Sequence, residues 1–355
     1  MKALKNFKNK KILITGHTGF KGSWLTLWLW KLGAKLMCVS NGVLTYPNHY
    51  QSLNFLNLIT EKKFDIYELK KIKKLIFDFK PDYIFHLAAQ ALVKESYVDP
   101  IKTWKSNTFG TLNILHSLKD YKKNCSVVII TSDKSYKNLE IKRGYKENDI
   151  LGGYDPYSAS KAAAELAIQS YYKSFLQHRK NIKLAVARAG NVIGGGDWSN
   201  DRIFPDAMKS LKNNKKLLLR NPNSTRPWQH VLEAIYGYLL LAISLKKKNI
   251  NSEAFNFGPR LSNNHNVLKL VKEIKKNFPR FKWKVFKNQN KKKYESSLLK
   301  LNSNKAKKIL GWQNKLSFFE TVKLTSDWYL GFFNKKNIFN LSINQIKKYE
   351  KILLK

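Results

Sequence analysis

The stretch KKILITGHTGFKG, residues Lys10–Gly22, decides the fold class of this chain. Its first half, KKILITG, is a short apolar run that closes on a glycine, which is the pattern of a buried parallel strand. Three glycines, Gly16, Gly19 and Gly22, then stand three positions apart. The segment Phe20–Ala34 is apolar on nearly all sides and predicts a buried helix. A strand, a glycine-rich turn and a helix in this order indicate the first unit of a doubly wound α/β sheet.

The alternation of strands and helices continues over residues 1–190. Further strands are predicted at Leu36–Ser40, Tyr83–Ala89, Val127–Ile130 and Leu184–Gly190, and helices at Leu69–Phe79, at Ile101–Leu118 and from Pro156 onward. This order predicts a parallel sheet of the Rossmann type. Residues 191–355 are expected to form mainly a smaller, interleaved substrate-binding lobe. The strand-like EAFNFGP suggests that the chain returns to the first domain at about residues 228–260.

The net charge of +42 over 355 residues raises the question of a nucleic-acid partner. The 58 lysines are spread from Lys2 to Lys355, whereas a nucleic-acid-binding surface gathers its positive charge in one patch or stripe. Arginine, which suits planar and bidentate contacts with phosphates, occurs only eight times. We therefore expect no nucleic-acid partner and interpret the charge as surface composition that also steers anionic substrates.

The two cysteines, Cys38 and Cys125, have no metal-site spacing and form no disulfide framework in a chain of this length. We expect both to be buried thiols in a reducing cytoplasm, and we expect no metal. The most apolar stretch, Trp24–Trp30, is far shorter than the ~20 residues that span a bilayer. These features predict a cytoplasmic protein without a membrane partner.

The glycine turn has a chemical interpretation. Without side chains its backbone can approach a pyrophosphate closely, and the following helix supplies free N–H groups and positive potential. The alternative is that the glycines serve tight packing only. A dinucleotide site normally also has an acidic residue ~20 positions further on, for the ribose hydroxyls. Here no Asp or Glu precedes Glu61, so Ser40, Asn41 or backbone groups would serve, and the choice between NAD and NADP stays open locally.

A second motif lies in YDPYSASKAAAELA, which places Tyr157 and Lys161 four residues apart. Asp155 can cap a helix and Pro156 can occupy its first turn, so both side chains lie on one helical face. A free tyrosine is a poor base at neutral pH, and a nearby ammonium favours its phenolate form. Such a pair can remove a proton from a sugar hydroxyl while a hydride leaves the same carbon.

The strand at Val127–Ile130 ends in TSDKSY, residues Thr131–Tyr136, which presents hydroxyls, a carboxylate and an ammonium. Groups of this kind can hydrogen-bond a reacting oxygen and transfer protons. The alternative for Asp133 and Lys134 is a plain exposed turn.

Together, TGHTGFKGSWLTLWL, HLAAQALV, TSDKSY, RAGNVIGGGDW and RPWQHVLEAIYGYLLLA resemble the extended short-chain dehydrogenase/reductase superfamily, and within it the nucleotide-sugar 4,6-dehydratases. The likeness runs over nearly the whole chain. It implies that a nucleotide-diphosphate hexose loses water through transient oxidation at C4 by NAD, elimination across C5–C6 and return of the hydride to C6. NAD would stay tightly bound and be regenerated in each turnover.

The resemblance also implies roles for individual residues. The catalytic residues are expected to be Ser132, Asp133, Lys134, Tyr157 and Lys161. In the implied reaction Ser132 hydrogen-bonds the 4-oxygen and Asp133 protonates the leaving 6-hydroxyl. Lys134 must lose its proton to act as the base at C5, so its role is either that of this base or that of a stabiliser of the enolate. The cofactor is expected to contact Gly16, Thr18, Gly19, Phe20, Gly22, Asp65, Ile66, Leu87, Ala88, Ala89 and Asn107, together with Tyr157 and Lys161. Asp65 and Ile66 resemble the pair that holds the adenine ring, with an ordinary helix cap as the alternative for Asp65.

Arginines concentrate where a diphosphate would need them. Four of the eight lie between Arg188 and Arg226, which suggests planar, bidentate recognition. Arg188 is expected to be structural because it is internal to a strand. The expected substrate-binding residues are Gln90, Asn191, Arg202, Arg220 and Arg226.

Other functions remain possible on these motifs. A UDP-sugar 4-epimerase shares the glycine turn and YxxxK, but usually has small or apolar residues at the positions of Asp133 and Lys134. A non-catalytic protein of the same fold would usually have a damaged YxxxK, which is intact here. The superfamily habit of pairing the Tyr157 helix across a two-fold axis predicts a homodimer or a dimer of dimers.

Overall fold

The computed structural model describes residues 2–55, 58–141, 143–260, 265–286 and 300–354. Seven parallel strands form the central sheet in the order β11–β6–β5–β4–β1–β2–β3. Their bounds are β1 Lys11–Thr15, β2 Lys35–Ser40, β3 Thr60–Lys63, β4 Tyr83–His86, β5 Cys125–Ile130, β6 Ile182–Ala189 and β11 Ala254–Phe257. The predicted doubly wound sheet of the Rossmann type is confirmed.

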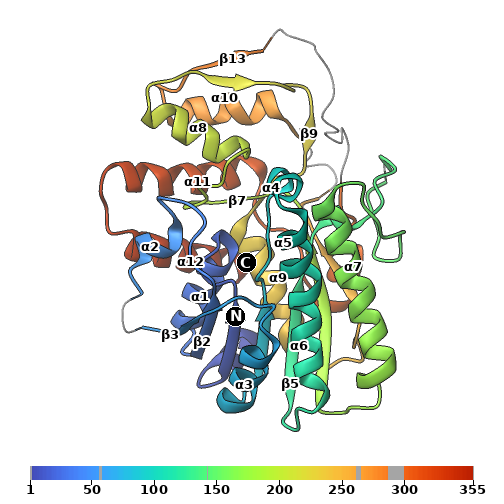
Figure 1. Ribbon diagram of the computed structural model, residues 1–355. Helices are drawn as coiled ribbons and strands as arrows, with labels where there is room; N and C mark the ends of the chain where they lie inside the picture. The colour runs from blue at the N-terminus through green and yellow to red at the C-terminus, as the bar shows by residue number, and fades with distance from the viewer. Residues whose placement is uncertain (1, 56–57, 142, 261–264, 287–299, 355) are drawn as a thin grey trace.

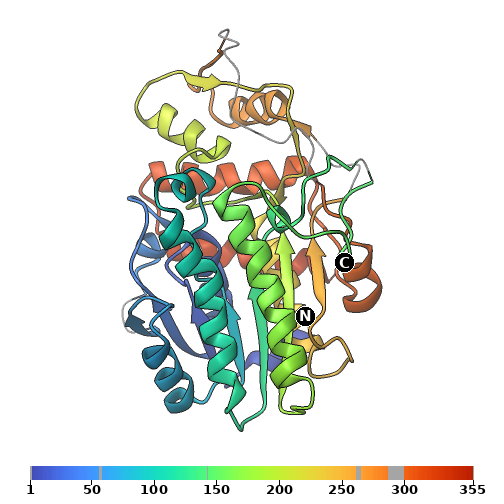
Figure 2. The same ribbon diagram turned by 45° about the vertical axis from the view of Figure 1, so that its right-hand side comes forward.

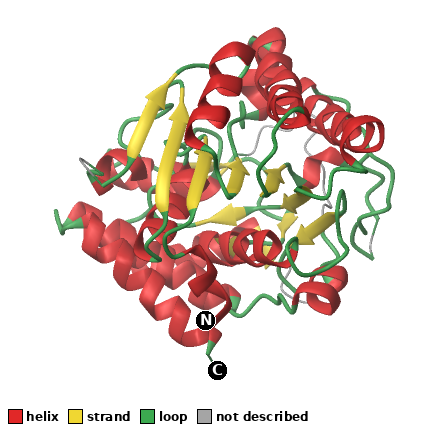
Figure 3. Cartoon of the chain, turned by 90° about the horizontal axis from the view of Figure 1, so that it is seen from below, coloured by secondary structure: helices red, strands yellow, loops and turns green. Residues whose placement is uncertain are grey.

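Helices cover both faces of this sheet. One face carries α3, α6 and α7, which lie side by side in Figure 2, and the other carries α1 and α9, with α12 packed on α1. The bounds are α1 Phe20–Lys31, α3 Leu69–Phe79, α6 Gly110–Lys119, α7 Pro156–Tyr171, α9 Val231–Ser244 and α12 Ile338–Leu353. Seen from below in Figure 3, the strands run between these two layers. Apolar residues on both faces explain why the strands read as continuous hydrophobic runs.

A smaller lobe lies beyond the carboxyl ends of the strands (Figure 1). It contains two short parallel strands and the helices around them. The bounds are α8 Ile203–Lys212, β8 Leu217–Leu219, α10 Val267–Asn277, β13 Trp283–Val285 and α11 Phe318–Phe333. Two further pairings of two residues each form separate two-stranded sheets: β7 Val192–Ile193 with β10 Gln229–His230, and β9 Thr225–Arg226 with β12 His265–Asn266. The division at residue 190 into two domains stays a prediction.

Short helices complete the fold. They are η1 Lys2–Phe7, α2 His49–Leu53, α4 Val93–Val98, α5 Pro100–Trp104, η2 Lys105–Phe109, η3 Asp133–Ser135, η4 Tyr172–Leu176 and η5 Ala306–Leu310. The expected helix at Ile101–Leu118 is therefore divided into α5, the π-helical turn η2 and α6. The π-helical turn holds Asn107, whose side chain bonds outside the helix. Extra residues of this kind inside α-helices are frequent at functional sites.

The expected strand Tyr83–Ala89 ends earlier, at His86. Beyond this point the chain stays beside β1, because the Leu87 amide donates to the Thr15 carbonyl at 3.0 Å and the Ala88 amide to the Thr15 hydroxyl at 3.2 Å. Leu87 and Ala88 therefore lie directly beside the glycine turn instead of extending the strand.

Both cysteines are buried free thiols, as expected. Among the described residues, no helix is both long and apolar enough to cross a membrane. The same part of the chain contains no group of three or more His, Cys, Asp or Glu side chains that could hold a metal ion.

Candidate active site

The helix that carries Tyr157 and Lys161 starts where the sequence predicts. Asp155 is its N-cap: one carboxylate oxygen accepts from the Ser158 amide at 2.9 Å, and the other accepts from the Ser158 hydroxyl at 2.6 Å. Pro156 occupies the first turn. Both Tyr157 and Lys161 are buried, and the Lys161 ammonium donates to the Ile130 carbonyl at the end of β5, at 3.3 Å. The helix therefore presents both groups at the carboxyl ends of the strands.

Burial controls the electrostatics of Tyr157. It raises the pKa of the phenol, while a hydrogen bond with Ser132 and the charge of Arg202 act in the opposite direction. The expectation that Lys161 would lower the phenol pKa below its ordinary value is therefore wrong, because desolvation of the phenolate outweighs the favourable charges.

Burial acts on Lys161 in the opposite sense. It lowers the pKa of the ammonium to about 8, with a further decrease from the charge of Lys21 and an increase from Glu165. A lysine with this pKa still carries a proton in most molecules at neutral pH, so it can hydrogen-bond and donate charge to the site.

The TSDKSY segment folds into η3 directly after β5. Ser132 is its N-cap and accepts from the Lys134 amide at 3.2 Å, while its hydroxyl donates to one carboxylate oxygen of Asp133 at 2.9 Å. Asp133 is only 5% exposed, so the alternative of a plain exposed turn does not hold for it. Lys134 is half-buried. A hydroxyl and a carboxylate therefore stand together beside Tyr157.

The absence of a side chain at Gly190, directly after β6, leaves room for the Asp133 carboxylate. A Cβ at this glycine would lie 2.9 Å from the second carboxylate oxygen of Asp133. The backbone after β6 thus closes over the carboxylate, and the following residues lead into the smaller lobe.

The glycine turn joins β1 to α1 and meets the requirements for a bound pyrophosphate. A Cβ at Gly16, whose φ is +78°, would lie 2.6 Å from the Ala88 amide nitrogen, and a Cβ at Gly22 would lie 2.0 Å from the Gly16 carbonyl oxygen. Packing alone therefore explains these two glycines. It does not explain Gly19, where a Cβ would meet one atom, the Gly16 oxygen, at an ordinary 3.4 Å. Open space over the N-terminus of α1 fits a ligand that approaches the backbone.

Thr18 and Phe20 hold this turn in different ways. The Thr18 hydroxyl donates to the Gly42 carbonyl at 2.5 Å, which ties the turn to the loop after β2. The Phe20 ring lies against Gly194, where a Cβ would approach it to 3.1 Å. The turn is therefore fixed both to the sheet and to the loop that leads into the smaller lobe.

The region expected to hold the adenosine lies after β2 and β3. Asp65 accepts from the Asn41 amide group at 2.7 Å and from the Tyr67 hydroxyl at 2.9 Å. The N-cap of α3 is Glu68, so Asp65 is not the ordinary helix cap that the alternative proposed. Ile66 is buried and packs on Gly110, where a Cβ would come within 2.5 Å of it.

Two residues near the turn, His17 and Tyr50, were missed in the sequence analysis. The His17 ring bonds to the Glu61 carboxylate at 2.8 Å, and the Tyr50 hydroxyl donates to the same oxygen at 2.5 Å. Glu61, which lies too far along the chain to match the usual spacing, is thereby brought to the glycine turn. Only the pairing of β2 with β3 makes this visible.

The loop after β4 is joined to α7 through Asn107. Its side-chain oxygen accepts from the Gln90 amide at 2.8 Å, and its side-chain nitrogen donates to the Gln90 carbonyl at 3.1 Å and to the Ser160 hydroxyl at 2.9 Å. The Gln90 side chain is itself held by Leu92 and Thr103. This fixes the segment Leu87–Gln90 between the glycine turn and the Tyr157 helix.

The expected substrate-binding arginines lie at the border of the lobe, already paired. Arg202 bonds to the buried Asp197 at 3.1 Å, and Arg220 lies 3.3 Å from Asp201. Arg226 donates to the Thr225 carbonyl at 2.8 Å.

Asn191 carries an unused donor. Its side-chain nitrogen is buried and has no hydrogen-bond partner among the described residues. A buried amide nitrogen of this kind is costly unless it gains an acceptor, which a bound ligand can supply.

Lys21 is the third missed residue. Burial and the charge of Arg202 lower the pKa of its ammonium to about 8, although the charges of Asp133 and Asp197 raise it. The signal was present in the sequence, since Lys21 interrupts the apolar start of α1 between Phe20 and Gly22.

Comparisons with known proteins agree with the fold described above. The family model described as GDP-mannose 4,6 dehydratase matches residues 13–325. A CDP-glucose 4,6-dehydratase of Salmonella typhimurium is 39% identical over 97% of this chain and 98% of its own length. Among solved structures, an epimerase from Methanothermobacter thermautotrophicus has a TM-score of 0.80 at 23% identity, covering 94% of this chain and 96% of its own. A dTDP-glucose 4,6-dehydratase from Bacillus anthracis, in complex with NAD, has a TM-score of 0.73 at 22% identity, covering 90% of this chain and 96% of its own.

Proposed function

This chain belongs to the GDP-mannose 4,6 dehydratase family, and on that premise we propose that it converts CDP-D-glucose to CDP-4-dehydro-6-deoxy-D-glucose and water. The observation that carries the proposal is the meeting of two proton-handling groups. Tyr157 on α7 and Asp133 on η3 lie close enough for the aspartate charge to act on the phenol. Oxidation and elimination of one sugar need both groups at one place.

The cofactor is NAD. The glycine turn, with Gly16, Gly19 and Gly22 and the neighbouring Thr18 and Phe20, would hold its pyrophosphate against the N-terminus of α1. The bound cofactor would supply the hydride acceptor for C4 of the sugar and the hydride that returns to C6. The remaining contacts would come from Asp65, Ile66, Leu87, Ala88, Ala89 and Asn107.

Tyr157 removes the proton of the 4-hydroxyl. Ser132 hydrogen-bonds the same oxygen, and Lys161 supplies positive charge behind the phenol. Support comes from the effect of Ser132, which lowers the pKa of Tyr157 against burial, and from the fixed position of the Lys161 ammonium at the end of β5. The 4-ketone that results makes the hydrogen at C5 acidic.

Asp133 and Lys134 serve the loss of water. A base takes the proton from C5 as the C5–H bond breaks, the electron pair of that bond forms the C5–C6 double bond, and the C6–O bond breaks as the protonated carboxyl group of Asp133 gives its proton to the leaving hydroxyl. The base returns a proton to C5 when the hydride reaches C6. Lys134 assists at C5, either as the base or by stabilising the enolate. The burial of Asp133 and its bond from Ser132 keep the carboxyl group aimed at one place.

The diphosphate of the substrate is held by Asn191, Arg202, Arg220 and Arg226, with Gln90 near the sugar. The unpartnered Asn191 nitrogen supports this assignment. Each guanidinium has five N–H donors, so Arg202 and Arg220 can keep their present carboxylate partners and still donate to the substrate.

The protein works as a homodimer or a dimer of dimers in the cytoplasm and supplies deoxysugars for surface polysaccharide. The outer faces of α5, η2 and α7 support the dimer. Ile101, Phe109 and Leu166 are large apolar residues that are 64%, 55% and 57% exposed there. Apolar side chains gathered on adjacent helices are typical of an interface between subunits.

The test is incubation of the purified protein with CDP-, dTDP-, UDP- and GDP-hexoses, followed by mass spectrometry. We expect CDP-glucose to lose one water and to give a 4-keto-6-deoxy product, with transient NADH absorbance. A product of unchanged mass would indicate a 4-epimerase. Turnover of another nucleotide hexose in preference to CDP-glucose would refute the proposed selectivity for the cytosine nucleotide but would still support 4,6-dehydration.

A further inference from the structure

Glu165 is a buried carboxylate on the face of α7 that also carries Tyr157 and Lys161. The three residues are four positions apart, so they follow one another along the helix. Glu165 is 1% exposed, and such a charge is retained in a protein interior only with strong partners. Its partners connect it to the two strands on which the proposed active site is built.

One oxygen of Glu165 receives the two hydroxyls that flank the elimination loop, which we define as Ser132–Lys134. The Thr131 hydroxyl donates to this oxygen at 2.7 Å, and the Ser135 hydroxyl donates to it at 2.9 Å. The loop is thus attached at both ends to a single atom on α7.

The charge of Glu165 is balanced by Arg188 of β6. The guanidinium donates to both carboxylate oxygens, with Nε at 2.9 Å from each. Arg188 also donates to the Tyr136 hydroxyl at 2.5 Å and lies 4.5 Å from the centre of that ring. The residue that follows Ser135 is therefore fixed by the same ion pair.

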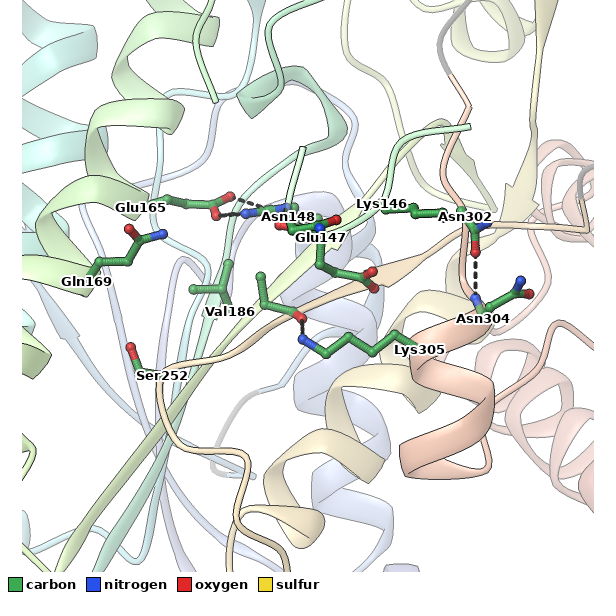
Figure 4. A pocket seen from close by; sticks show the side chains of 12 residues that line it. Lys146, Glu147, Asn148, Glu165, Gln169, Val186, Ser252, Asn302, Asn304 and Lys305 are labelled. Atoms are coloured by element: carbon green, nitrogen blue, oxygen red, sulfur yellow. Dashed lines mark hydrogen bonds and ion pairs between the residues drawn. The ribbon is translucent and has the colours of Figure 1, made fainter. Parts of the chain in front are cut away.

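The ion pair does not belong to the cleft of the proposed reaction. Glu165 and Arg188 line a pocket of about 470 Å³ beside β6 and the edge strand β11, together with Gln169 and Val186. Figure 4 shows Glu165 and Gln169 reaching toward it from α7. None of its twelve lining residues is an expected site residue.

We propose that Glu165 is a positioning residue, which holds the elimination loop in register with the Tyr157 helix so that one sugar meets both groups in succession. The inference rests on the proposed function. Tyr157 acts at the 4-oxygen and Asp133 at the 6-oxygen of the same hexose, so a shift of the loop along α7 separates the two steps.

A sharp test removes the two hydroxyls and keeps the ion pair. Thr131→Val combined with Ser135→Ala leaves Glu165 bonded to Arg188 and releases the loop. A misplacement of about 1 Å in a catalytic group costs on the order of 100-fold in rate. Because Ser132 moves with the loop, we expect bound NADH to form from CDP-glucose somewhat more slowly than in the original, and formation of the 4-keto-6-deoxy product to fall by about 100-fold, so that NADH accumulates.

Two matched controls separate positioning from general damage. Ser117→Ala removes another buried hydroxyl, which donates to the Asn113 carbonyl on α6. Glu233→Gln alters another buried glutamate, which accepts from the Lys315 and Leu316 amides and from Tyr349. Both should lower the melting temperature, but neither should change the ratio of the two rates.

Glu165→Gln adds a second readout. The carboxylate raises the pKa of Lys161 against the effect of burial, so its neutralisation should move the alkaline limb of the pH–rate profile below pH 8. Thr131→Val with Ser135→Ala should leave that limb in place. Equal losses in both half-reactions, or no loss, would overturn the inference. If the unaltered protein forms no 4-keto product, the proposed function fails instead.

Discussion

Gly19 and Gly22 give a direct test of where the cofactor lies, because alanine has a different effect at each. At Gly22 the added Cβ would be 2.0 Å from the Gly16 carbonyl oxygen and 2.9 Å from two further backbone atoms, and no rotation relieves these contacts. Overpacking of this kind costs about 1–3 kcal/mol of unfolding free energy. We therefore expect Gly22→Ala to lower both stability and NAD affinity.

At Gly19 the added Cβ fits the folded chain. The backbone has φ −73° and ψ 165°, which alanine adopts freely, and the nearest contact is 3.4 Å. The lower entropy of the unfolded chain stabilises the variant, while alanine is a poorer N-cap than glycine, so the two effects leave the unfolding free energy within about 1 kcal/mol. The Cβ enters the space above the turn, so NAD affinity should fall by at least about tenfold, or ~1.4 kcal/mol.

The assay pairs denaturant unfolding with calorimetric titration of NAD, on both variants and the unaltered protein. Gly33→Ala is a suitable control, since this glycine ends the turn after α1 at φ +78° and its Cβ meets only the Lys8 side chain at 3.5 Å. It should lower stability and leave NAD affinity unchanged. Full NAD affinity in Gly19→Ala would refute the placement of the pyrophosphate over the turn.

The catalytic residues give three further predictions. Tyr157→Phe should lower turnover by at least about 100-fold while NAD binding persists in calorimetry, and a variant with nearly full turnover would contradict the assigned base. Asp133→Asn should slow water loss while C4 is still oxidised, which absorbance would record as accumulated NADH; absence of this NADH would count against the role of Asp133. Because burial lowers the pKa of Lys161 to about 8, the protonated form is lost as pH rises, so turnover should decline above pH 8. Lys161→Arg keeps its charge to far higher pH and should remove that decline, whereas an unchanged profile would show that another group titrates there.

Much of the site could be predicted because its information is local. The glycine turn and the start of α7 at Asp155 and Pro156 depend on neighbours within a few positions. The alternation of apolar runs with amphipathic segments predicted the sheet in the same way. Such signals need no knowledge of how distant parts of the chain pack.

The missed features join residues far apart in the chain. The bond between His17 and Glu61 spans 44 positions, and that between Glu165 and Arg188 spans 23. The pKa of Tyr157 was expected in the wrong direction for a related reason, since desolvation depends on everything packed around the ring. Glu165 did leave one trace, as a charge in the otherwise apolar AAAELA at the spacing of Tyr157 and Lys161.

The late arrival of β11 has a consequence for how this protein is made. A ribosome releases β6 well before the chain reaches Ala254–Phe257, the strand that pairs with it, and before α9, which packs on β5 and β6. Until residue 257 has emerged, the nascent chain has an unpaired sheet edge at β6, and until α9 has emerged, the apolar face over β5 and β6 lacks its covering helix. The central sheet is thus completed only after residue 257 of 355 has been made, and an isolated fragment that ends at residue 190 is a poor starting point for biochemical study.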